Sequence, residues 1–202
     1  MRKFSRLAIV ISQEGNEDSV FSAPIVEMTN GSNSVQVSDF ESALNMLPPG
    51  SEVYVIANGT VGNKIVHRLA RAIREACVFV SLDLSSVKEL SHVSNSPFKG
   101  NLNLVSISFP NNLDSISAQG FADCKNLESV TLPATVQKIG VQAFSGCEKL
   151  NSMEFEDTDG WVAVRENGNE EIISGLEKTE DNPYRFTLQS SPFRNCMLRK
   201  TS

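Results

Sequence analysis

Few residues in this sequence have the type and spacing that catalysis requires. The two histidines are His67 and His92, and neither has the serine–aspartate or cysteine–asparagine context of a hydrolytic triad. We expect both to be structural or solvated. Asp157 and Asp159 precede Gly160 as in a calcium-binding loop, but the other ligands of such a loop are missing, so we expect a turn. The sequence therefore predicts no catalytic residue, no metal site and no enzyme.

A glycine-containing segment between a predicted strand and a predicted helix is the nearest approach to a nucleotide site. In residues 56–64, IANGTVGNK, two residues separate the glycines, and Lys64 is followed by Ile65. A phosphate-binding P-loop has four residues between its glycines, and then lysine followed by serine or threonine. The segment therefore predicts a turn and a helix start, and we expect no cofactor.

The charge and the apolar runs of the chain limit its partners and its location. The net charge of −6 argues against a nucleic-acid partner, because proteins that bind phosphate backbones carry a basic face. No apolar run approaches the roughly 20 residues that span a bilayer, so we expect no membrane span. The basic residues 1–6 are followed by only five apolar residues, 7–11, whereas an export signal needs about 7–15. We interpret residues 7–11 as a β-strand.

The four cysteines follow neither a zinc-binding nor a Cys-x-x-Cys pattern. Disulfide frameworks are typical of small secreted domains that lack a core, and this chain is long enough to have one. We expect mostly free, buried thiols that pack as small apolar side chains, although the spacing leaves a disulfide open. The cysteines are Cys77, Cys124, Cys147 and Cys196.

A 23-residue period organises the middle of the sequence. Residues 121–132, FADCKNLESVTL, have the same pattern as residues 144–155, FSGCEKLNSMEF. A fixed period of 20–29 residues with this spacing of apolar positions is typical of a leucine-rich repeat solenoid. The positions that recur at this interval include Phe98, Phe121 and Phe144; Leu104, Leu127 and Leu150; Ile107, Val130 and Met153; and Phe109, Leu132 and Phe155.

Each repeat predicts one short strand and a return around a buried interior. Val130 and Leu132 alternate with polar Thr131, which is the period of a strand, and Pro133 ends it. A single coil cannot bury its apolar residues, so the coils must stack and their strands must pair in parallel. Residues 84–98 are two positions longer than residues 109–121, which predicts an insertion in the first coil, with His92 in the inserted loop.

The regions on both sides of the repeats are predicted to cover the ends of the solenoid. Residues 52–56 predict a strand, residues 63–76 a helix with Asn63 as N-cap, and residues 38–41 a capping box that opens a short helix to about Leu47. Beyond the repeats, residues 184–188 predict a strand, and residues 193–196 repeat the Phe-x-x-Cys start of a coil. We therefore expect an N-terminal βα cap at residues 1–78, repeats at 79–157 and a C-terminal cap at 158–202.

Residues 80–155 resemble the BspA-like, or treponemal-type, leucine-rich repeats, whose coils begin F-x-x-C-x-x-L and contain a strand that ends in proline. The clearest stretch is FADCKNLESVTLPATVQKIGVQAF. The resemblance implies an α/β fold: a leucine-rich repeat solenoid with a parallel concave sheet, a βα lead-in cap and an irregular C-terminal cap. Asn101 replaces the cysteine that the later coils have at Cys124 and Cys147, and both residue types suit a ladder at the turn.

Three surfaces are candidates for binding. The concave face is predicted to be polar and nearly free of the aromatic and arginine side chains that dominate binding energy, so we expect a strong contact elsewhere. The caps offer aromatic residues, whose alternative role is cap packing, and the second helix offers a basic side, whose alternative role is a solvated face. The residues are Asp83, Ser106, Ser108, Ser129, Thr131, Ser152 and Glu154 on the concave face; Trp161, Tyr184 and Phe186 in the cap; and Lys64, Arg68, Arg71 and Arg74 on the helix.

Two functions remain open at this point. The first is a non-enzymatic protein–protein interaction module. The family resemblance implies that it acts as a bacterial adhesin or host-attachment protein at the surface or in secreted form. The second is an intracellular scaffold, or a carrier of a small apolar ligand in a cleft between a cap and a coil, which the missing export signal and unpaired thiols favour. Because the export signal is incomplete, the sequence leaves the location open, and cytoplasmic and periplasmic locations stay alternatives to the surface or secreted one.

Overall fold

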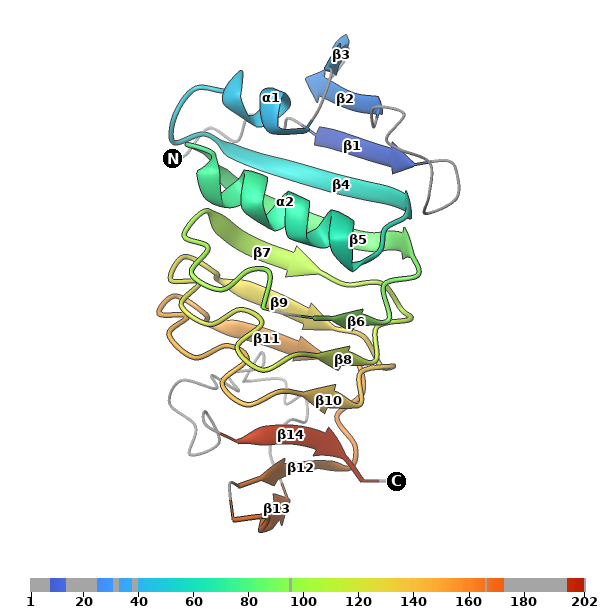
Figure 1. The fold of residues 1–202 in the computed structure, drawn as a ribbon, viewed down its shortest axis with the longest axis vertical. Coiled ribbons are helices and arrows are strands. Elements are labelled where there is room, and N and C mark those ends of the chain that lie inside the picture. Colours follow the sequence, from blue (N-terminus) through green and yellow to red (C-terminus); the bar gives the residue numbers. More distant parts are fainter. Residues whose placement is uncertain are drawn as a thin grey trace, which may run out of the picture.

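A stack of coils gives the molecule an elongated, layered shape, with α1, β2 and β3 near one end and β13 at the other (Figure 1). This computed structural model describes residues 8–13, 25–30, 33–37, 40–94, 96–165, 167–172 and 196–201. The predicted repeats occupy the centre of the stack. The predicted leucine-rich repeat solenoid with a mainly parallel sheet is confirmed.

The larger of two sheets has eight strands and continues from the repeats into the N-terminal region. Strands β1, β4, β5, β7, β9 and β11 run parallel to one another, and β2 and β3 are added antiparallel at the edge next to β1. The strand predicted at residues 52–56 is present and extends to Thr60, so the expected turn around Gly59 is wrong. The spatial order is β11 (Ser152–Phe155), β9 (Ser129–Leu132), β7 (Leu104–Ser108), β5 (Phe79–Lys88), β4 (Glu52–Thr60), β1 (Ala8–Gln13), β2 (Ile25–Asn30) and β3 (Asn33–Val37).

A second, six-stranded sheet lies on the other side of the coils (Figure 1). Three two-residue strands, one from each coil, pair in parallel at the 23-residue interval, and three C-terminal strands extend the sheet in antiparallel fashion. In spatial order they are β13 (Glu170–Ile172), β12 (Trp161–Val164), β14 (Met197–Lys200), β10 (Lys138–Ile139), β8 (Ser115–Ile116) and β6 (His92–Val93).

The strand β6 corrects the expected position of the insertion in the first coil. His92 pairs with Ser115 and Val93 with Ile116, so these residues already follow the 23-residue register. The two additional residues lie earlier, before Leu90, where β5 is prolonged to Lys88 and pairs with the end of β4. A longer first strand is possible there because β4 is itself longer than the strands of the repeats.

The two helices lie on the same side of the large sheet as the second sheet (Figure 1). Helix α1 (Phe40–Asn45) is shorter than predicted, and the proposed capping serine, Ser38, lies outside the described residues. Helix α2 (Asn63–Glu75) begins after Gly62, so Asn63 is not its N-cap. The side-chain oxygen of Asn63 instead accepts a hydrogen bond from the backbone of Ser94, which ties the helix to the first coil.

A row of phenylalanine rings forms the centre of the solenoid. Phe98, Phe121 and Phe144 are at most 1% exposed. The rings of Phe98 and Phe121 have centroids 5.0 Å apart, those of Phe121 and Phe144 are 5.2 Å apart, and both interplanar angles are 8°. Offset stacking of this kind adds to the gain from burying each ring. The recurring leucine and isoleucine positions are buried beside this row.

A ladder of hydrogen bonds from buried side chains to backbone carbonyls explains Cys124 and Cys147, and also Asn101 at the equivalent position of the first coil. The thiols of Cys124 and Cys147 contact the carbonyl oxygens of Phe98 and Phe121, one coil earlier, at 2.9 and 3.0 Å. Asn101 is fully buried, and its amide donates to the carbonyl of Ala70 in α2 at 2.9 Å. The first coil therefore stacks on a helix, whose carbonyl requires the longer reach of asparagine.

The described part of the C-terminal region adds the strands β12, β13 and β14 to the second sheet. Leu198 in β14 pairs antiparallel with Ile139. Of the coil start predicted at residues 193–196, only Cys196 lies among the described residues. Pairing with β14 provides hydrogen-bond partners for the backbone groups at the open edge of β10. A single antiparallel strand does this without a further full repeat. The strand predicted at residues 184–188 lies outside the described residues.

Candidate functional site

The outward side chains of the large sheet form two columns on its outer face, the predicted concave face. One column passes through Ser81, Ser106, Ser129 and Ser152, and the second through Asp83, Ser108, Thr131 and Glu154. The register thus brings together all seven residues proposed for this face. In β9 and β11 the alternate residues Val130, Leu132, Met153 and Phe155 are buried, so the face there is supported by a packed interior.

The outer face also carries aromatic residues that the sequence analysis did not assign to it. Tyr54 pairs with Ser81 and heads the first column, and its side chain is 42% exposed. Phe79 lies at the start of β5 and is partly exposed. The expectation of a face nearly free of aromatic residues is therefore wrong. The signal was available in the strand predicted at residues 52–56, whose outward positions include Tyr54.

A hydrogen bond fixes the position of Tyr54. Its hydroxyl donates to Oδ2 of Asp83 at 2.7 Å, and Oδ1 of Asp83 accepts from the backbone of Ser85 at 2.9 Å. Burial, followed by the hydrogen bond to Asp83 and its charge, raises the pKa of Tyr54 to about 12. Burial acts against ionisation of Asp83, but hydrogen bonds from Ser85 and Tyr54 outweigh it and lower the pKa of Asp83. The aspartate is therefore a stable negative charge on this face.

A groove of about 690 Å³ crosses the beginnings of the strands on the outer face. Phe79 and Val105, both partly exposed, provide its apolar surface, and the serine column forms one side. A groove of this size is within the range that binding sites occupy. Its lining consists of Gly50, Ser51, Glu52, Phe79, Ser81, Val105, Ser106, Asn126, Glu128, Ser129 and Lys149.

Three charged side chains line the groove, two carboxylates and one ammonium group. Glu52 and Glu128 line it at positions three strands apart, and Lys149 lies at the end nearer β11. Asp83 and Glu154 add two carboxylates in the second column of the same face. The outer face therefore combines a limited apolar surface with charged side chains of both signs.

The predicted aromatic contacts of the cap do not form an exposed cluster in the described residues. Trp161 is only 2% exposed, and its ring packs edge-on against Phe155 with centroids 5.4 Å apart. Its indole nitrogen donates to the carbonyl of Asp157 at 3.0 Å, which leaves the side chain no freedom to contact a partner. Trp161 is thus a core residue, the alternative considered for it, because it covers the last coil. Tyr184 and Phe186 lie outside the described residues.

The basic side of α2 is partly occupied by contacts within the molecule. Arg71 forms an ion pair with Glu75 at 3.0 Å. Arg74 donates to the carbonyls of Pro97 and Lys99, and so holds the first coil against the helix. Lys64 and Arg68 are exposed on the same helix. A docking role for the four residues remains a proposal, and two of them already have a structural one.

The histidines lie together at the junction between α2 and the first coil. His67 is 3.1 Å from the carbonyl of Ser94, and His92 is 3.4 Å from the side-chain nitrogen of Asn63. The expected structural role of His67 agrees with this contact. Asp157 and Gly160 lie in the predicted turn, where Oδ1 of Asp157 accepts from the backbone of Asp159 at 3.0 Å.

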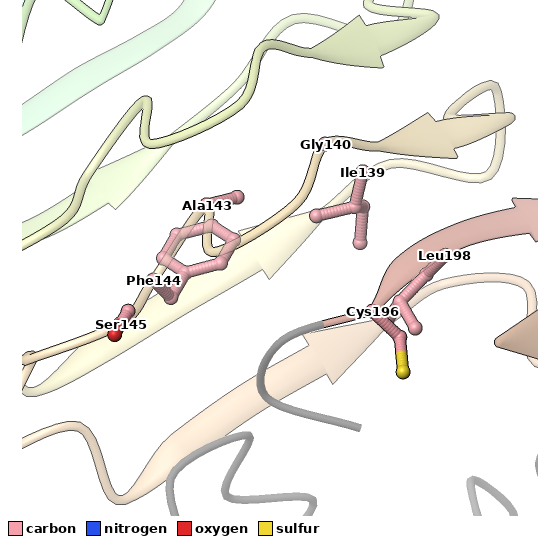
Figure 2. Close-up of a pocket in the computed structure, with 7 residues that line it drawn as sticks. All are labelled: Ile139, Gly140, Ala143, Phe144, Ser145, Cys196 and Leu198. Atoms are coloured by element: carbon pink, nitrogen blue, oxygen red, sulfur yellow. The ribbon is translucent and has the colours of Figure 1, made fainter. Parts of the chain in front are cut away.

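A small cavity lies between the last coil and β14, close to the end of the phenylalanine row. Figure 2 shows its lining, including Phe144, Cys196 and Leu198. Its volume is about 10 Å³, which is room for about one water molecule. This cavity gives the idea of a small apolar ligand between cap and coil no support.

The four cysteines, all of which are described, are free, and Cys77 alone among them is exposed. The hydrogen bond to Cys124 and burial raise the pKa of the Cys147 thiol, so it stays protonated and packs as an apolar group. Within the ranges that the structure describes, no group of three or more His, Cys, Asp or Glu side chains is placed to hold a metal ion. The described helices include none long and apolar enough to cross a membrane.

Parallel strands, a fixed 23-residue period and a continuous row of stacked rings define a leucine-rich repeat solenoid. Residues 75–165 match, in 6 copies, the family described as BspA type Leucine rich repeat region, and this part of the chain is a BspA-like leucine-rich repeat region. Such repeats are a non-enzymatic fold that serves protein–protein interaction. No curated protein gives a significant match to the chain.

Proposed function

We propose that this protein binds a protein partner on the outer face of its large sheet, at the groove between β4 and β9. The groove itself is the observation that carries the proposal, because it is the place where Phe79 and Val105 expose apolar surface beside fixed polar groups. Partly exposed aromatic side chains surrounded by polar ones are typical of the centre of an interface. The rigid strands beneath them supply the preorganisation that makes binding less costly.

Tyr54 and Asp83 support the same surface. Tyrosine contributes contact area at a low entropic cost, and the bond between these two side chains holds the ring in place before a partner arrives. The six-stranded sheet on the opposite side has two-residue strands in the repeats, and its C-terminal part is occupied by ion pairs such as that between Arg199 and Glu170. We therefore assign the partner to the large sheet.

A site-specific crosslinking experiment tests this assignment. A photoreactive amino acid is placed at Ser106 or Ser129 in the groove, or at Ser115 on the six-stranded sheet as the matched control, and the chain is exposed to proteins of its own source and to extracellular matrix proteins. The groove positions should yield crosslinked adducts. An excess of unlabelled chain should compete for the partner and abolish these adducts. An excess of folded Ser106→Trp, whose groove is blocked, should not abolish them. Equal adducts from both faces, or adducts that the unlabelled chain does not abolish, would contradict the proposal.

Attachment to other cells or to matrix proteins is the particular form of this function that the family resemblance supports. It requires the protein to be exposed outside the cell that makes it. Digestion of intact cells with an external protease should then remove the protein, and the purified chain should bind matrix proteins saturably. Complete protection from the protease would exclude this form of the function while leaving the groove as a binding surface.

The free thiols favour a second form, an intracellular scaffold. Cys77, Cys124, Cys147 and Cys196 are all unpaired, and unpaired cysteines are usual in reducing compartments. The protease experiment also separates this form from the first, since an intracellular scaffold is degraded only after the cells are opened. In both forms the binding surface is the same.

A further inference from the structure

We propose that the groove on the outer face binds a straight, neutral oligosaccharide chain carried by the partner, with one sugar residue over each strand. The inference rests on the proposed function and names the chemical class of the group that the groove takes. Three features of the groove lead to it: a row of serine hydroxyls, an aromatic ring beside them, and the distance between successive strands.

The serine side of the groove offers hydroxyl groups that the protein does not use itself. Ser81, Ser106 and Ser129 are half-buried, and within the described residues their hydroxyls form no hydrogen bond. Elsewhere in the coils such groups are used, as where Ser96 donates to the carbonyl of Ala118 at 2.8 Å. Each serine hydroxyl can donate one hydrogen bond and accept two, which is the capacity that the hydroxyl groups of a sugar match.

Phe79 supplies a surface on which a sugar ring can stack. It lies two residues before Ser81 in β5, so both side chains point to the outer face, and its ring is partly exposed. The C–H groups on one face of a sugar ring pack on an aromatic ring, and the hydroxyls at its edge stay available for hydrogen bonds. Among the residues that line the groove, Val105 is the one other with an apolar side chain. An apolar peptide segment would leave most polar groups of the groove without partners, so a sugar fits better.

The distance between strands matches the length of a sugar residue. The three serines lie on neighbouring strands, β5, β7 and β9, and such strands are about 4.8 Å apart. This distance is close to the advance of one residue in a straight, β-1,4-linked hexose chain, so successive sugars meet equivalent hydroxyls. An extended peptide advances about 3.4 Å per residue and repeats its side-chain direction every second residue, so it does not keep step with the strands.

The other side of the groove adds donors and acceptors. Nδ2 of Asn126 donates to the carbonyl of Leu102 at 2.7 Å, which leaves the side-chain oxygen of Asn126 to accept. The carboxylate of Glu128 accepts hydrogen bonds and the ammonium group of Lys149 donates them. A neutral sugar uses both, because each of its hydroxyls donates and accepts, whereas a chain of uniform charge would be repelled by one of the two.

Isothermal titration of the intact chain with defined oligosaccharides tests the class. Cellohexaose and chitohexaose are straight and β-1,4-linked, and maltohexaose, the matched control, has the glucose units of cellohexaose in a curved, α-1,4-linked chain. We expect at least one straight chain to bind about tenfold more tightly than maltohexaose. Its affinity should rise from the disaccharide to the tetrasaccharide and then level off, because the groove crosses four strands, from β4 to β9.

Substitutions in the groove test the contacts. Phe79→Ala should weaken binding of the straight chain by about tenfold, and Phe79→Tyr, which keeps the ring, should retain it. Ser106→Ala and Ser129→Ala should each weaken it by about threefold to tenfold. Ser115→Ala, on the six-stranded sheet, is the matched control and should leave binding unchanged. Thermal midpoints show that each variant is folded.

Removal of the partner's sugars separates this inference from the proposed function. Adducts from a photoreactive residue at Ser106 should be lost when the partner proteins are treated with glycosidases before crosslinking, with the loss of sugar checked by mass spectrometry. Adducts that persist after this treatment would overturn the sugar inference and leave the groove as a surface for the protein itself. Two other results would also overturn it: neither straight chain exceeding maltohexaose, or equal binding of the straight chain by Phe79→Ala.

Discussion

The rings of Phe98 and Phe121 lie parallel, 5.0 Å apart, although 23 residues separate them in the chain. Phe144 repeats the relationship on the other side of Phe121. Residues one sequence period apart therefore lie one coil apart in the structure. The ring of Phe121 is packed between the equivalent rings of the two neighbouring coils. This continuous interior is what allows the outer face to be a rigid surface.

Replacement of the central ring should be the most damaging change to the interior. Phe121→Ala removes both stacking contacts and leaves a cavity, and we expect a loss of about 3–5 kcal/mol in the free energy of unfolding. Leu102→Ala, at a leucine that is 49% exposed, serves as the control and should stay within about 0.5 kcal/mol. Urea denaturation measures both. A loss below about 1 kcal/mol for Phe121→Ala would show that the row does not hold the coils together.

Gly140 should tolerate no side chain, because the backbone of the preceding coil lies too close. A Cβ atom at this position would be 2.2 Å from the backbone nitrogen of Ala118. We expect Gly140→Ala to be destabilised by several kcal/mol or to be recovered unfolded, as measured by circular dichroism and thermal melting. Gly100 is the control: its φ of 69° disfavours alanine by about 1–2 kcal/mol, but nothing lies within 4 Å. A Gly140→Ala chain as stable as Gly100→Ala would contradict the observed packing of the coils.

Restoring the repeat's cysteine at position 101 should destabilise the protein. Asn101→Cys matches Cys124 and Cys147, but a thiol cannot reach the carbonyl of Ala70 as the amide does, and it also loses the bond to the backbone of Asn103. We expect a loss of about 1–3 kcal/mol in the free energy of unfolding. If Asn101→Cys were neutral or stabilising in urea denaturation, the match between the first coil and α2 would not depend on this side chain.

The pair of Tyr54 and Asp83 predicts a measurable titration. Between the ordinary tyrosine pKa of 10.0 and about 12, the unfolded chain loses the phenolic proton while the folded chain keeps it, so this pair's contribution to stability falls as pH rises through that window. At the acidic end, the contribution of Asp83, whose folded pKa is lowered, is present above its unfolded pKa and lost as pH falls through the folded one.

Ultraviolet titration of the tyrosinate absorbance measures this directly in a Tyr184→Phe background, which leaves Tyr54 as the one tyrosine of the chain. Asp83→Asn should lower the pKa of Tyr54, though not to 10.0, because burial, the largest cause of its rise, is kept. An unchanged titration in Asp83→Asn would mean that the two side chains are not coupled.

The repeats could be predicted in detail because their information is local and periodic. The alternation around Val130 and the recurrence of Phe121 and Phe144 correctly gave the strands, their direction and the two columns of the outer face. The ends of the solenoid depend on contacts between distant segments. The partner of Asn63 is Ser94, and β10 is covered by an antiparallel strand, and no local pattern specifies either pairing.

The candidate site was predicted only in part for the same reason. The serine column follows from the period, whereas Tyr54 and Phe79 join it through the pairing of β4 with β5, outside the repeat. Trp161 was considered as a contact because a lone tryptophan in a polar stretch has the same appearance in a sequence whether it is exposed or covers a core. Its packing on Phe155 decides the question.

Hydrogen exchange with and without a bound partner is the most direct test of the claim that the outer face of the large sheet is the binding surface. Exchange should slow in the segments that line the groove, at Glu52 in β4, Phe79 in β5, Val105 in β7 and Glu128 before β9, and stay unchanged in β6, β8 and β10. Slowing confined to the six-stranded sheet or to α2, with the groove unchanged, would contradict the account.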